Sequence, residues 1–535
     1  MATESVALPK FASLASNILP WLFLCVVYAP GGVVAAQPIP TARLYAEHCA
    51  SCHGPDRLGA IGPALLPENL GRLKRDEAVA TIREGRVATQ MPPFKDKLSA
   101  EQIAQLAELI YQPLPEVPRW GMTEIRASHL LHVKPDEKLS DKPVFKVKDP
   151  LNLFIVVELG DHHATLLDGD RFEPIARFPT RFALHGGPKY SPDGRYVYFA
   201  SRDGWVSKYD IYNLKFIAEV RAGINTRNAA VSGDGKYVAV GNYLPHSIVI
   251  LDARDLTPIK VIEVKGSDGK SSRVSAVYDA APRKSFIAAL KDIPEVWEIT
   301  YDPHAEPVYE GMVHDFKYGE GIAVPGPFPP RRIRLDDYLD DFFFDQEYVH
   351  IIGASREAGK GQIINLDVRK RIATLNLPGM PHLGSGITWQ RDGHMVMATP
   401  NLREGVVSII DMSDWKVIQR IDTLGPGFFM RSHENTPYAW VDAMMSPKDK
   451  DKIQIIDKRT FKVVKTLTPA PGKTAAHTEF TRDGKYALVS VWDMDGALVI
   501  YDAATFKEVK RLPMKKPSGK YNVYNKITRS AGTSH

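Results

Sequence analysis

The sequence is poor in cysteine and in net charge, and it has no long uninterrupted apolar run. Three of its 535 residues are cysteine, too few for a disulfide-stabilised scaffold. The 68 basic and 63 acidic residues leave a net charge of +5, too small an excess to indicate nucleic-acid binding. One largely apolar stretch, residues 18–29, ends at Pro30-Gly31-Gly32 before it reaches the length of a membrane span. We therefore expect a globular protein with no nucleic acid among its partners and no membrane span in the mature chain.

The first 36 residues have the pattern of an export signal. Lys10 precedes the apolar stretch, and Val34 and Ala36 are small residues placed for cleavage before Gln37. A retained membrane anchor is the alternative, which the interruption of the apolar stretch disfavours. We predict a signal peptide over residues 1–36, which would remove Cys25, and a mature protein in the periplasm.

The two remaining cysteines lie in the segment Cys49-Ala50-Ser51-Cys52-His53. Thiols three residues apart on one helical turn can add to the two vinyl groups of a haem, and the histidine that follows then reaches the iron. A disulfide or half of a zinc site is the alternative, but the chain has no second Cys/Cys or Cys/His pair at zinc spacing. The segment predicts a covalent haem c held by Cys49 and Cys52, with His53 on its iron.

Residues 37–112 are predicted to form a small helical domain of the class I cytochrome c type around this haem. Asp76 is placed to cap a helix that ends at Gly85, and Ser99 with Gln102 forms a capping box for a later helix.

The segment Thr89-Gln90-Met91-Pro92-Pro93-Phe94 separates these two helices. Its prolines exclude a helix or strand interior, and a methionine in such a loop can supply the second axial ligand of a haem c. We predict Met91 as that ligand. His48, next to the attachment segment, is the alternative.

A proline-rich linker, residues 113–125, leads to a larger part of β character, residues 126–535. Asp-Gly turns at 193–194, 234–235, 392–393 and 483–484 each precede short β-branched runs. The first two turns lie 41 residues apart and the last two 91, which fits one and two units of about 45 residues, the length of a propeller blade. Two β-sandwiches would not keep this period. We predict a β-propeller of eight or nine blades; the proline-rich residues 324–330 are either a lid or a rigid connector.

The order of these parts, the linker end Arg119-Trp120-Gly121-Met122 and the C-terminal run from Gly519 to Asn525 resemble the cytochrome cd1 nitrite reductase family and its paralogues over nearly the whole mature chain. The resemblance implies an eight-bladed propeller that binds haem d1 or its dihydro precursor without a covalent bond.

Further residues follow from this resemblance. It implies that His185, in the segment 181–185, and His382, in the segment 379–382, contact the iron of haem d1 on its two faces. Without it, each would be read as an ordinary surface or core histidine. It also implies that Arg202, Arg227 and Tyr243 contact the carboxylates or the edge of haem d1, a role to which the planar arginine fork is suited.

Two departures from the reductase pattern bear on the reaction. The segment 338–342 holds Asp340 and Asp341 where the reductases carry a second distal histidine, and Ser385 stands where they carry an arginine. An ionised carboxylate beside the iron would repel nitrite and is a poor proton donor at neutral pH. We therefore do not expect an efficient nitrite reductase.

Two other departures add groups that can exchange protons. His477 and Tyr521 occupy positions that the reductases fill with glutamine and phenylalanine. This pattern resembles the dihydro-haem d1 dehydrogenases, paralogues that convert a propionate to an acrylate in the last step of haem d1 biosynthesis. The resemblance implies that His477 is the general base and that Tyr521 orients the propionate or assists.

It also implies a route for the products. The covalent haem would carry the electrons to a periplasmic acceptor, and a cytochrome cd1 nitrite reductase would receive the finished haem d1. A purely structural His477, a nitrite reductase with an unusual pocket, and a haem d1 carrier without catalysis are the alternatives.

Overall fold

The computed structural model describes residues 40–528 except 61, 71–72, 87–90, 117, 135, 182, 311–321 and 356–359. The predicted signal peptide, residues 1–36, lies outside the described residues. Within the described part of the chain, no helix is long and apolar enough to cross a membrane.

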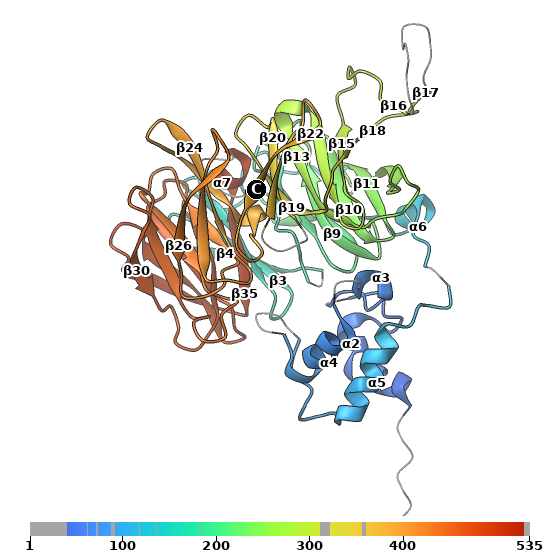
Figure 1. The fold of residues 1–535 in the computed structure, drawn as a ribbon, viewed down its shortest axis with the longest axis horizontal. Coiled ribbons are helices and arrows are strands. Elements are labelled where there is room, and N and C mark those ends of the chain that lie inside the picture. Colours follow the sequence, from blue (N-terminus) through green and yellow to red (C-terminus); the bar gives the residue numbers. More distant parts are fainter. Residues whose placement is uncertain are drawn as a thin grey trace, which may run out of the picture. The chain divides into compact units, whose positions relative to one another are not determined.

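Five short helices form the first part of the described chain (Figure 1, blue). They are α1 (Thr41–His48), α2 (Ala50–His53), α3 (Pro67–Leu70), α4 (Arg75–Glu84) and α5 (Ala100–Ile110). Their buried core consists of Leu44, Tyr45, Ile82, Phe94, Leu98, Ile103, Leu106 and Ala107.

The two predicted capping arrangements have different outcomes. The Ser99 hydroxyl accepts from the Gln102 N–H at 3.2 Å and the Gln102 side chain accepts from the Ser99 N–H at 2.9 Å, so this capping box is confirmed. The prediction for Asp76 is wrong. α4 begins one residue earlier, and Glu77 accepts from the N–H of the N-cap residue Lys74 at 3.0 Å, so Asp76 lies inside the first turn.

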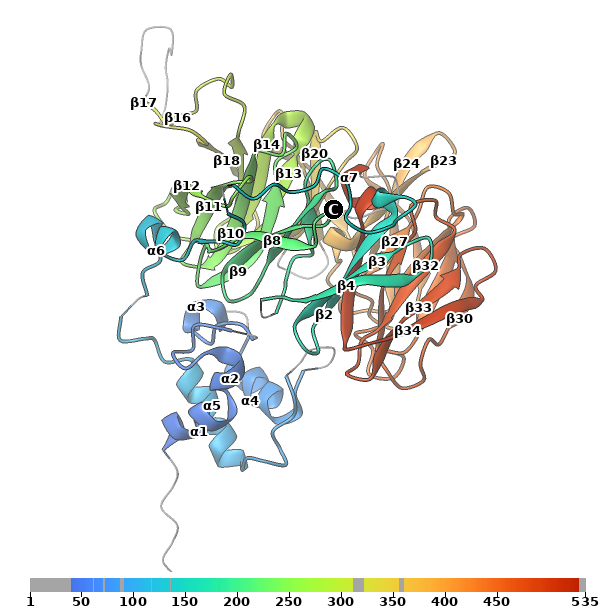
Figure 2. The same cartoon turned by 180° about the vertical axis from the view of Figure 1, so that it is seen from behind.

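The rest of the described chain contains eight antiparallel sheets of four or five strands, the blades of the predicted propeller (Figures 1 and 2). Blade 1 contains β2 (Leu153–Glu158), β3 (His163–Asp168), β4 (Glu173–Pro179) and β35 (Pro517–Asn522); blade 2 contains β5 (Lys189–Tyr190), β6 (Tyr196–Ala200), β7 (Trp205–Asp210), β8 (Lys215–Arg221) and the added β1 (Leu130–Leu131). Blade 3 contains β9 (Asn225–Val231), β10 (Tyr237–Leu244), β11 (Ser247–Asp252) and β12 (Pro258–Glu263); blade 4 contains β13 (Val274–Ala280), β14 (Ser285–Leu290), β15 (Glu295–Thr300) and β18 (Pro330–Arg334).

The second half of the propeller repeats this pattern. Blade 5 contains β19 (Leu339–Phe344), β20 (His350–Ser355), β21 (Lys360–Asn365) and β22 (Lys370–Asn376); blade 6 contains β23 (Ile387–Arg391), β24 (His394–Pro400), β25 (Val406–Asp411) and β26 (Lys416–Asp422). Blade 7 contains β27 (Met430–Ser432), β28 (Tyr438–Asp442), β29 (Ile453–Asp457) and β30 (Lys462–Leu467); blade 8 contains β31 (Ala475–Phe480), β32 (Tyr486–Val491), β33 (Gly496–Asp502) and β34 (Glu508–Met514). A small ribbon of β16 (Tyr309–Glu310) and β17 (Ile322–Ala323) lies outside the blades.

Blade 1 combines strands from the two ends of the propeller sequence. β35 pairs antiparallel with β2, with Ile155 opposite Tyr521 and Val156 opposite Lys520, and α7 (Val523–Thr528) follows directly. Because the last strand completes the first sheet, the ring of blades is closed by backbone hydrogen bonds. The closure also places Tyr521 on the edge strand β35 of the first blade, next to β2.

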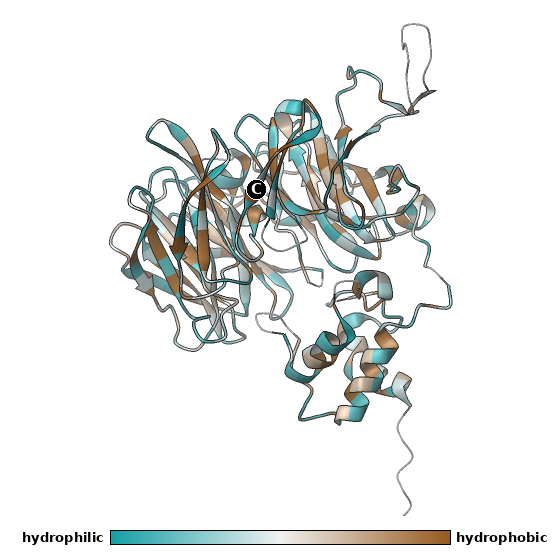
Figure 3. Ribbon diagram, in the orientation of Figure 1, coloured by the Kyte–Doolittle hydropathy of each residue, from teal (hydrophilic) through white to brown (hydrophobic). Residues whose placement is uncertain are grey.

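The strands bury alternating apolar residues between neighbouring blades. One such cluster joins blades 3 and 4 through Ile248, Ile250, Phe286 and Trp297, and the strongest hydrophobic colouring in Figure 3 lies on the blade strands and the helices of the first domain. The predicted Asp-Gly turns are present, and their glycines have a φ of +71° to +83°. As predicted, strands follow these turns: β6 follows the turn at 193–194 and β32 follows the turn at 483–484.

Two connecting segments pack on the propeller. α6 (Met122–Ala127) begins within the last residues of the predicted linker, and its Ile125 is fully buried against strands of blades 2 and 3. In the proline-rich residues 324–330, Phe328 is buried with its ring 4.9 Å from that of Tyr237. This packing supports the connector reading of residues 324–330 rather than the lid.

Candidate functional site

The attachment segment has the geometry that a haem c requires. Cys49 precedes α2, Cys52 lies within it, and both are half-buried thiols that are not joined in a disulfide. Nδ1 of His53 lies 2.8 Å from the Pro63 carbonyl oxygen, so it donates a hydrogen bond and leaves Nε2 for iron. Burial lowers the pKa of His53 and so favours the neutral form that binds a metal. The residues therefore fit a covalent haem.

The loop with the predicted second ligand packs against the same domain core. Met91 and Cys49 both contact the hydrophobic cluster of the helical domain, whereas His48, at the end of α1, has its ring 6.3 Å from that of Phe94. The assignment of Met91 to the haem iron stays a prediction.

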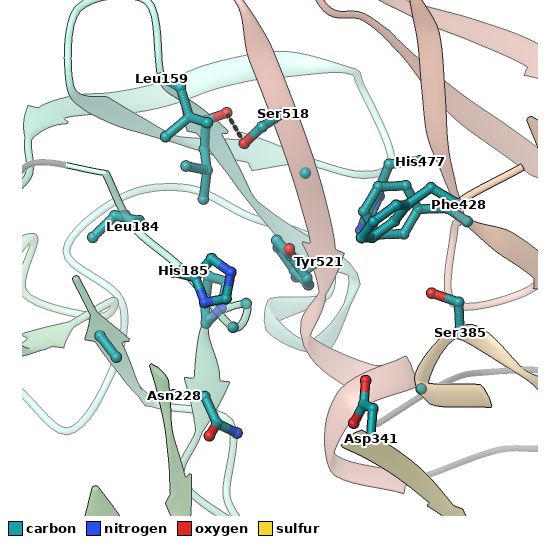
Figure 4. A pocket seen from close by; sticks show the side chains of 18 of the residues that line it. Leu159, Leu184, His185, Asn228, Asp341, Ser385, Phe428, His477, Ser518 and Tyr521 are labelled. Carbon is teal, nitrogen blue, oxygen red and sulfur yellow. Dashed lines mark hydrogen bonds between the residues drawn. The ribbon is translucent and has the colours of Figure 1, made fainter. Parts of the chain in front are cut away.

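A cavity of about 530 Å³ lies in the propeller, and Figure 4 shows part of its wall. Most of its lining comes from the innermost strands of the blades or the segments just before them; Arg202 follows β6 and Lys526 lies on α7. The residues most relevant to chemistry are His185, Arg202, Arg227, Asp341, His382, Ser385, Phe428, Phe429, Arg431, His477, Tyr521 and Lys526. The ring of blades thus brings together residues that lie more than 300 positions apart in the sequence.

His185 and His382 are oriented in the same way. Nδ1 of His185 lies 2.7 Å from the carbonyl oxygen of Arg227, and Nδ1 of His382 lies 2.6 Å from that of Phe428. In each case the carbonyl belongs to the next blade or the segment just before it. Burial lowers the pKa of both imidazoles, so both are neutral. Nε2 of His382 points away from its carbonyl partner and can bind a metal, whereas Nε2 of His185 lies 3.0 Å from Nη1 of Arg227, which would have to move aside for His185 to bind iron.

Two arginines predicted to contact the tetrapyrrole line the cavity near His185. Arg227 places Nη1 3.0 Å from Nε2 of His185, and burial together with Arg227 lowers the pKa of Arg202 to about 10. Two buried cations so close together require anions, and carboxylates of a tetrapyrrole meet that requirement.

Tyr243 is not among the residues that line the cavity. Its ring lies 5.3 Å from Nζ of Lys291 and 5.5 Å from the guanidinium of Arg273. Burial alone would raise the pKa of Tyr243, but Arg227, Lys291 and Arg202 lower it to about 8. Its expected contact with the tetrapyrrole stays a prediction.

The structure brings His477 and Tyr521 together although 44 residues separate them in the sequence. Their ring centroids are 5.0 Å apart, and in Figure 4 the Tyr521 ring is seen between His185 and His477. His477 has a φ of +51° at a β-bulge of β31, and its Nδ1 is buried with no hydrogen-bond partner in the described part of the chain.

The protonation states of this pair follow from their burial and from the charges beside them. Burial, and then the positive charges of Lys520 and Arg431, hold the pKa of His477 well below its ordinary value. His477 is therefore neutral at pH 7. Burial raises the pKa of Tyr521 to about 12, so the phenol keeps its proton.

The carboxylate on the cavity wall is that of Asp341 and not that of Asp340. Asp341 accepts from the Tyr278 hydroxyl at 3.0 Å, whereas Asp340 is buried 3.8 Å from Nζ of Lys291. The two residues are neighbours on β19, and neighbouring side chains of a strand point to opposite faces. Ser385 also lines the cavity, at the position where the reductase pattern has an arginine.

Sequence reasoning missed the charged residues beside His477. Arg431 on β27, Glu479 on β31 and Lys526 on α7 are buried, and Arg431 and Lys526 line the cavity. No motif surrounds them: Arg431 and Glu479 come from the neighbouring blades 7 and 8, and the closure of the ring adds Lys526.

Comparison with known proteins agrees with both parts of the structure. The family model described as "Cytochrome D1 heme domain" matches residues 148–318 and 314–526, and the model "Cytochrome C oxidase, cbb3-type, subunit III" matches residues 36–110. The chain is 55% identical to a "Dihydro-heme d1 dehydrogenase" of Pseudomonas aeruginosa, over 94% of this chain and 98% of that protein. The chain belongs to the dihydro-haem d1 dehydrogenase family.

Other relatives place this family among related propellers. The solved structure titled "Dihydro-heme d1 dehydrogenase NirN in complex with DHE" matches with a TM-score of 0.78 at 55% identity, covering 91% of this chain and all of that chain. A "Nitrite reductase" of Stutzerimonas stutzeri is 26% identical over 98% of this chain and 99% of that protein. The predicted fold, the oxidoreductase class and the two predicted cofactors, a haem c and a d1-type tetrapyrrole, are thereby confirmed.

Proposed function

We propose that this protein oxidises the propionate side chain of dihydro-haem d1 to the acrylate of haem d1, in the periplasm. The observation that carries the proposal is one cavity that contains two identically oriented imidazoles, His185 and His382, together with a neutral His477 against Tyr521. The 55% identity to a dihydro-haem d1 dehydrogenase supports the substrate.

The reaction removes two protons and two electrons from adjacent carbons of the side chain, so that a single C–C bond becomes a double bond. His185 and His382 hold the iron of the substrate on its two faces, and Arg202 and Arg227 bind carboxylates of the macrocycle. These contacts fix the side chain relative to His477, and such positioning supplies a large part of the catalysis.

His477 takes one proton from the side chain and passes it to solvent, after which it can take the second proton. Its neutral imidazole has a lone pair to accept the proton, and Nδ1 has no competing hydrogen bond in the described structure. Tyr521, with its pKa raised to about 12, donates a hydrogen bond to the substrate and does not act as a base. The two groups thus have separate roles.

The covalent haem supplies one-electron acceptor chemistry when it is attached through Cys49 and Cys52 with His53 on its iron. Two electrons leave per product, so a periplasmic one-electron acceptor must reoxidise the protein. We propose that a cytochrome cd1 nitrite reductase receives the finished haem d1.

Nitrite reduction is not supported by the cavity. Asp341 places a carboxylate on the wall and Ser385 offers no positive charge there, so neither a proton donor nor an anion receptor stands at these positions.

The test supplies purified protein with dihydro-haem d1 and an electron acceptor and follows the absorbance and mass of the pigment. Wild-type protein is expected to remove two hydrogens per pigment, and His477→Gln is expected to slow this by about 10²- to 10⁴-fold, the usual contribution of a general base. His394→Gln, an exposed histidine on β24, is the matched control and should convert at the wild-type rate.

Other outcomes separate the alternatives. Conversion at the wild-type rate by His477→Gln would remove His477 from the mechanism. Transfer of unchanged pigment to apo nitrite reductase without any oxidation would show a carrier, and rapid nitric oxide formation from nitrite would show a reductase.

A further inference from the structure

A cluster of buried charges lies beside His477, and no role in the mechanism above accounts for it. Arg431 and Lys526 line the cavity, with side chains only 4% and 9% exposed. Oε2 of the fully buried Glu479 lies 3.7 Å from Nε of Arg431 and 3.7 Å from Nζ of Lys526. Lys520, opposite them on β35, donates to the Ser490 hydroxyl at 2.8 Å.

Two cations of this cluster face the cavity. Arg431 stays a cation because guanidinium does not lose its proton in proteins, and Lys526 has a pKa of about 7, lowered by burial and then by Arg431. Oε2 of Glu479 contacts both of them. Because both cations also line the cavity, they are placed to pair with an anionic group of a ligand that enters it.

The cluster is separate from the arginines that face His185. Arg431 belongs to blade 7 and Lys526 to the final helix, whereas Arg202 and Arg227 belong to blades 2 and 3. Nζ of Lys526 lies 5.6 Å from the centre of the Tyr521 ring, which in turn is 5.0 Å from His477. One side of the cavity therefore combines two cations with the proposed base.

We propose that Arg431, with Lys526 beside it, is the receptor for the carboxylate of the propionate that is oxidised, and that it presents the adjacent carbons to His477. This inference rests on the proposed function. A planar guanidinium can hold a carboxylate through two parallel hydrogen bonds, which fixes the direction of the chain attached to it. Arg431 is thus a substrate-binding group distinct from Arg202 and Arg227.

Binding of this carboxylate also changes His477. The charged groups around the imidazole are Lys520 on β35, Arg431 on β27, Lys526 on α7, Glu479 on its own strand, and Asp442 on β28, whose carboxylate accepts from the His477 N–H at 3.3 Å. The three cations disfavour a protonated imidazole. A substrate carboxylate offsets them, so His477 becomes a stronger base once the substrate is bound.

The test uses the holoprotein with its haem c and compares Arg431→Gln and Arg431→Lys with wild type. We expect Arg431→Gln to lower kcat/KM by about 10- to 100-fold, the effect of one lost charge-assisted pair of hydrogen bonds, and Arg431→Lys to recover part of it. Removing one cation should also move the acid limb of the kcat/KM profile to higher pH. Arg202→Gln is the comparison variant, which should weaken pigment binding without moving that limb.

A substrate analogue separates recognition from a structural role. If the oxidisable propionate is replaced by its primary amide, wild-type protein should lose affinity by about the same factor as Arg431→Gln, and the two changes together should lose little more. Glu479→Gln in the Arg431→Gln background restores the charge balance, so a loss of folding in the single variant does not prevent the measurement.

The outcomes are distinguishable. If wild type does not oxidise dihydro-haem d1, the proposed function itself fails. If wild type oxidises it but the effects of the amide and of Arg431→Gln are fully additive, or the acid limb does not move, the carboxylate binds elsewhere and this inference is overturned.

Discussion

At the scale of single residues, Gly187 holds the aromatic ring of Tyr521 in place. Its φ is +70°, and a Cβ at this position would lie 2.9 Å from Cε1 of Tyr521. We expect Gly187→Ala to lower stability by about 1 kcal/mol through the left-handed backbone and, by displacing the ring, to weaken binding of dihydro-haem d1 at least about tenfold. Thermal unfolding and absorbance titration with the pigment measure the two effects.

Gly472, in the loop after β30, is the matched control for this substitution. It has a φ of +77°, and nothing lies within 4 Å of a Cβ built on it. Gly472→Ala should therefore show the same small loss of stability with unchanged pigment binding. Equal pigment binding by both variants would mean that the position of the Tyr521 ring does not matter.

Residue types in short motifs were predictable, but their orientation was not. The attachment motif predicts His53, and the family resemblance implies His185 and His382, as iron contacts, yet the carbonyl that orients each ring lies 10, 42 and 46 residues further along the chain. The same limit applies to Arg431 and Lys526, since a lone cation has no signal until the fold encloses it. The pKa of His477 depends on these neighbours and could not be anticipated without them.

At the scale of elements, β28 ends in a carboxylate that organises one side of the cavity. Asp442 accepts from the N–H of Phe428 at 2.8 Å and from that of His477 at 3.3 Å, so one side chain connects the segment before β27 with the bulge of β31. Burial raises its pKa from 3.8 to about 6 in spite of these hydrogen bonds. The neutral form is therefore the one that the fold favours.

The pH dependence of stability should reveal this carboxyl group. Because folding raises the pKa of Asp442, this group stabilises the folded state at low pH. The stabilisation is complete at pH values below 3.8, the pKa in the unfolded chain, and it is lost as the pH rises through about 6. Relative to Asp442→Asn, wild type should gain about 3 kcal/mol as the pH falls from 7 to 4, because each pKa unit corresponds to about 1.4 kcal/mol. Denaturant unfolding of the propeller, followed by tryptophan fluorescence over this pH range, measures the difference.

Asp457 on β29 provides a control of opposite sign. A hydrogen bond from Arg459 lowers its pKa to about 2, so its stabilisation is present above pH 3.8 and is lost as the pH falls towards 2. The difference in the free energy of unfolding between Asp457→Asn and wild type should therefore be constant between pH 5 and 7. If the difference in the free energy of unfolding between Asp442→Asn and wild type is also constant from pH 4 to 7, the raised pKa of Asp442 is contradicted.

The regular elements were predictable to within a residue or two, and the irregular ones were not. The Asp-Gly turns fixed where β6 and β32 begin, because glycine is the residue that accepts the left-handed turn. The bulge that places His477 has no comparable signal: it sits in the buried run Ala475–Phe480, where a regular strand was equally compatible with the residues. The proposed base thus lies at the point where the strand departs from regularity.

At the scale of the whole molecule, the number of blades depends on how the two ends of the propeller meet. Repeat length allowed eight or nine blades, and the pairing of β35 with β2 leaves eight sheets in the described structure. The same pairing delivers Tyr521 and Lys526 from the C-terminal end of the propeller to a cavity whose first wall residues precede them by more than 300 positions. A site made by closure of a ring cannot be read from any local segment.

The protein has two tetrapyrrole sites, the covalent haem c and the propeller cavity, and electron transfer between them gives a prediction for the chain as a whole. If Met91 is the second ligand of the haem c iron, Met91→Ala should abolish the long-wavelength absorption band of His/Met ligation in the oxidised protein. Met91→His should lower the haem c potential by about 0.1–0.3 V, within the roughly 0.8 V range that axial ligands span. Redox titration and optical spectra of the holoprotein measure both changes.

A lower potential makes the haem c a poorer electron acceptor, so Met91→His should slow oxidation of dihydro-haem d1 while its affinity for the propeller stays unchanged. His48→Ala is the control, because His48 is the other residue near the attachment segment that could ligate the iron, and it should keep the native spectrum and rate. Absence of the band from the native oxidised protein, together with a haem spectrum that changes in His48→Ala and not in Met91→Ala, would move the ligand assignment to His48. Unchanged turnover at the lowered potential would instead mean that electrons leave the propeller without passing through the covalent haem. The cytochrome domain would then serve a step other than the oxidation of dihydro-haem d1.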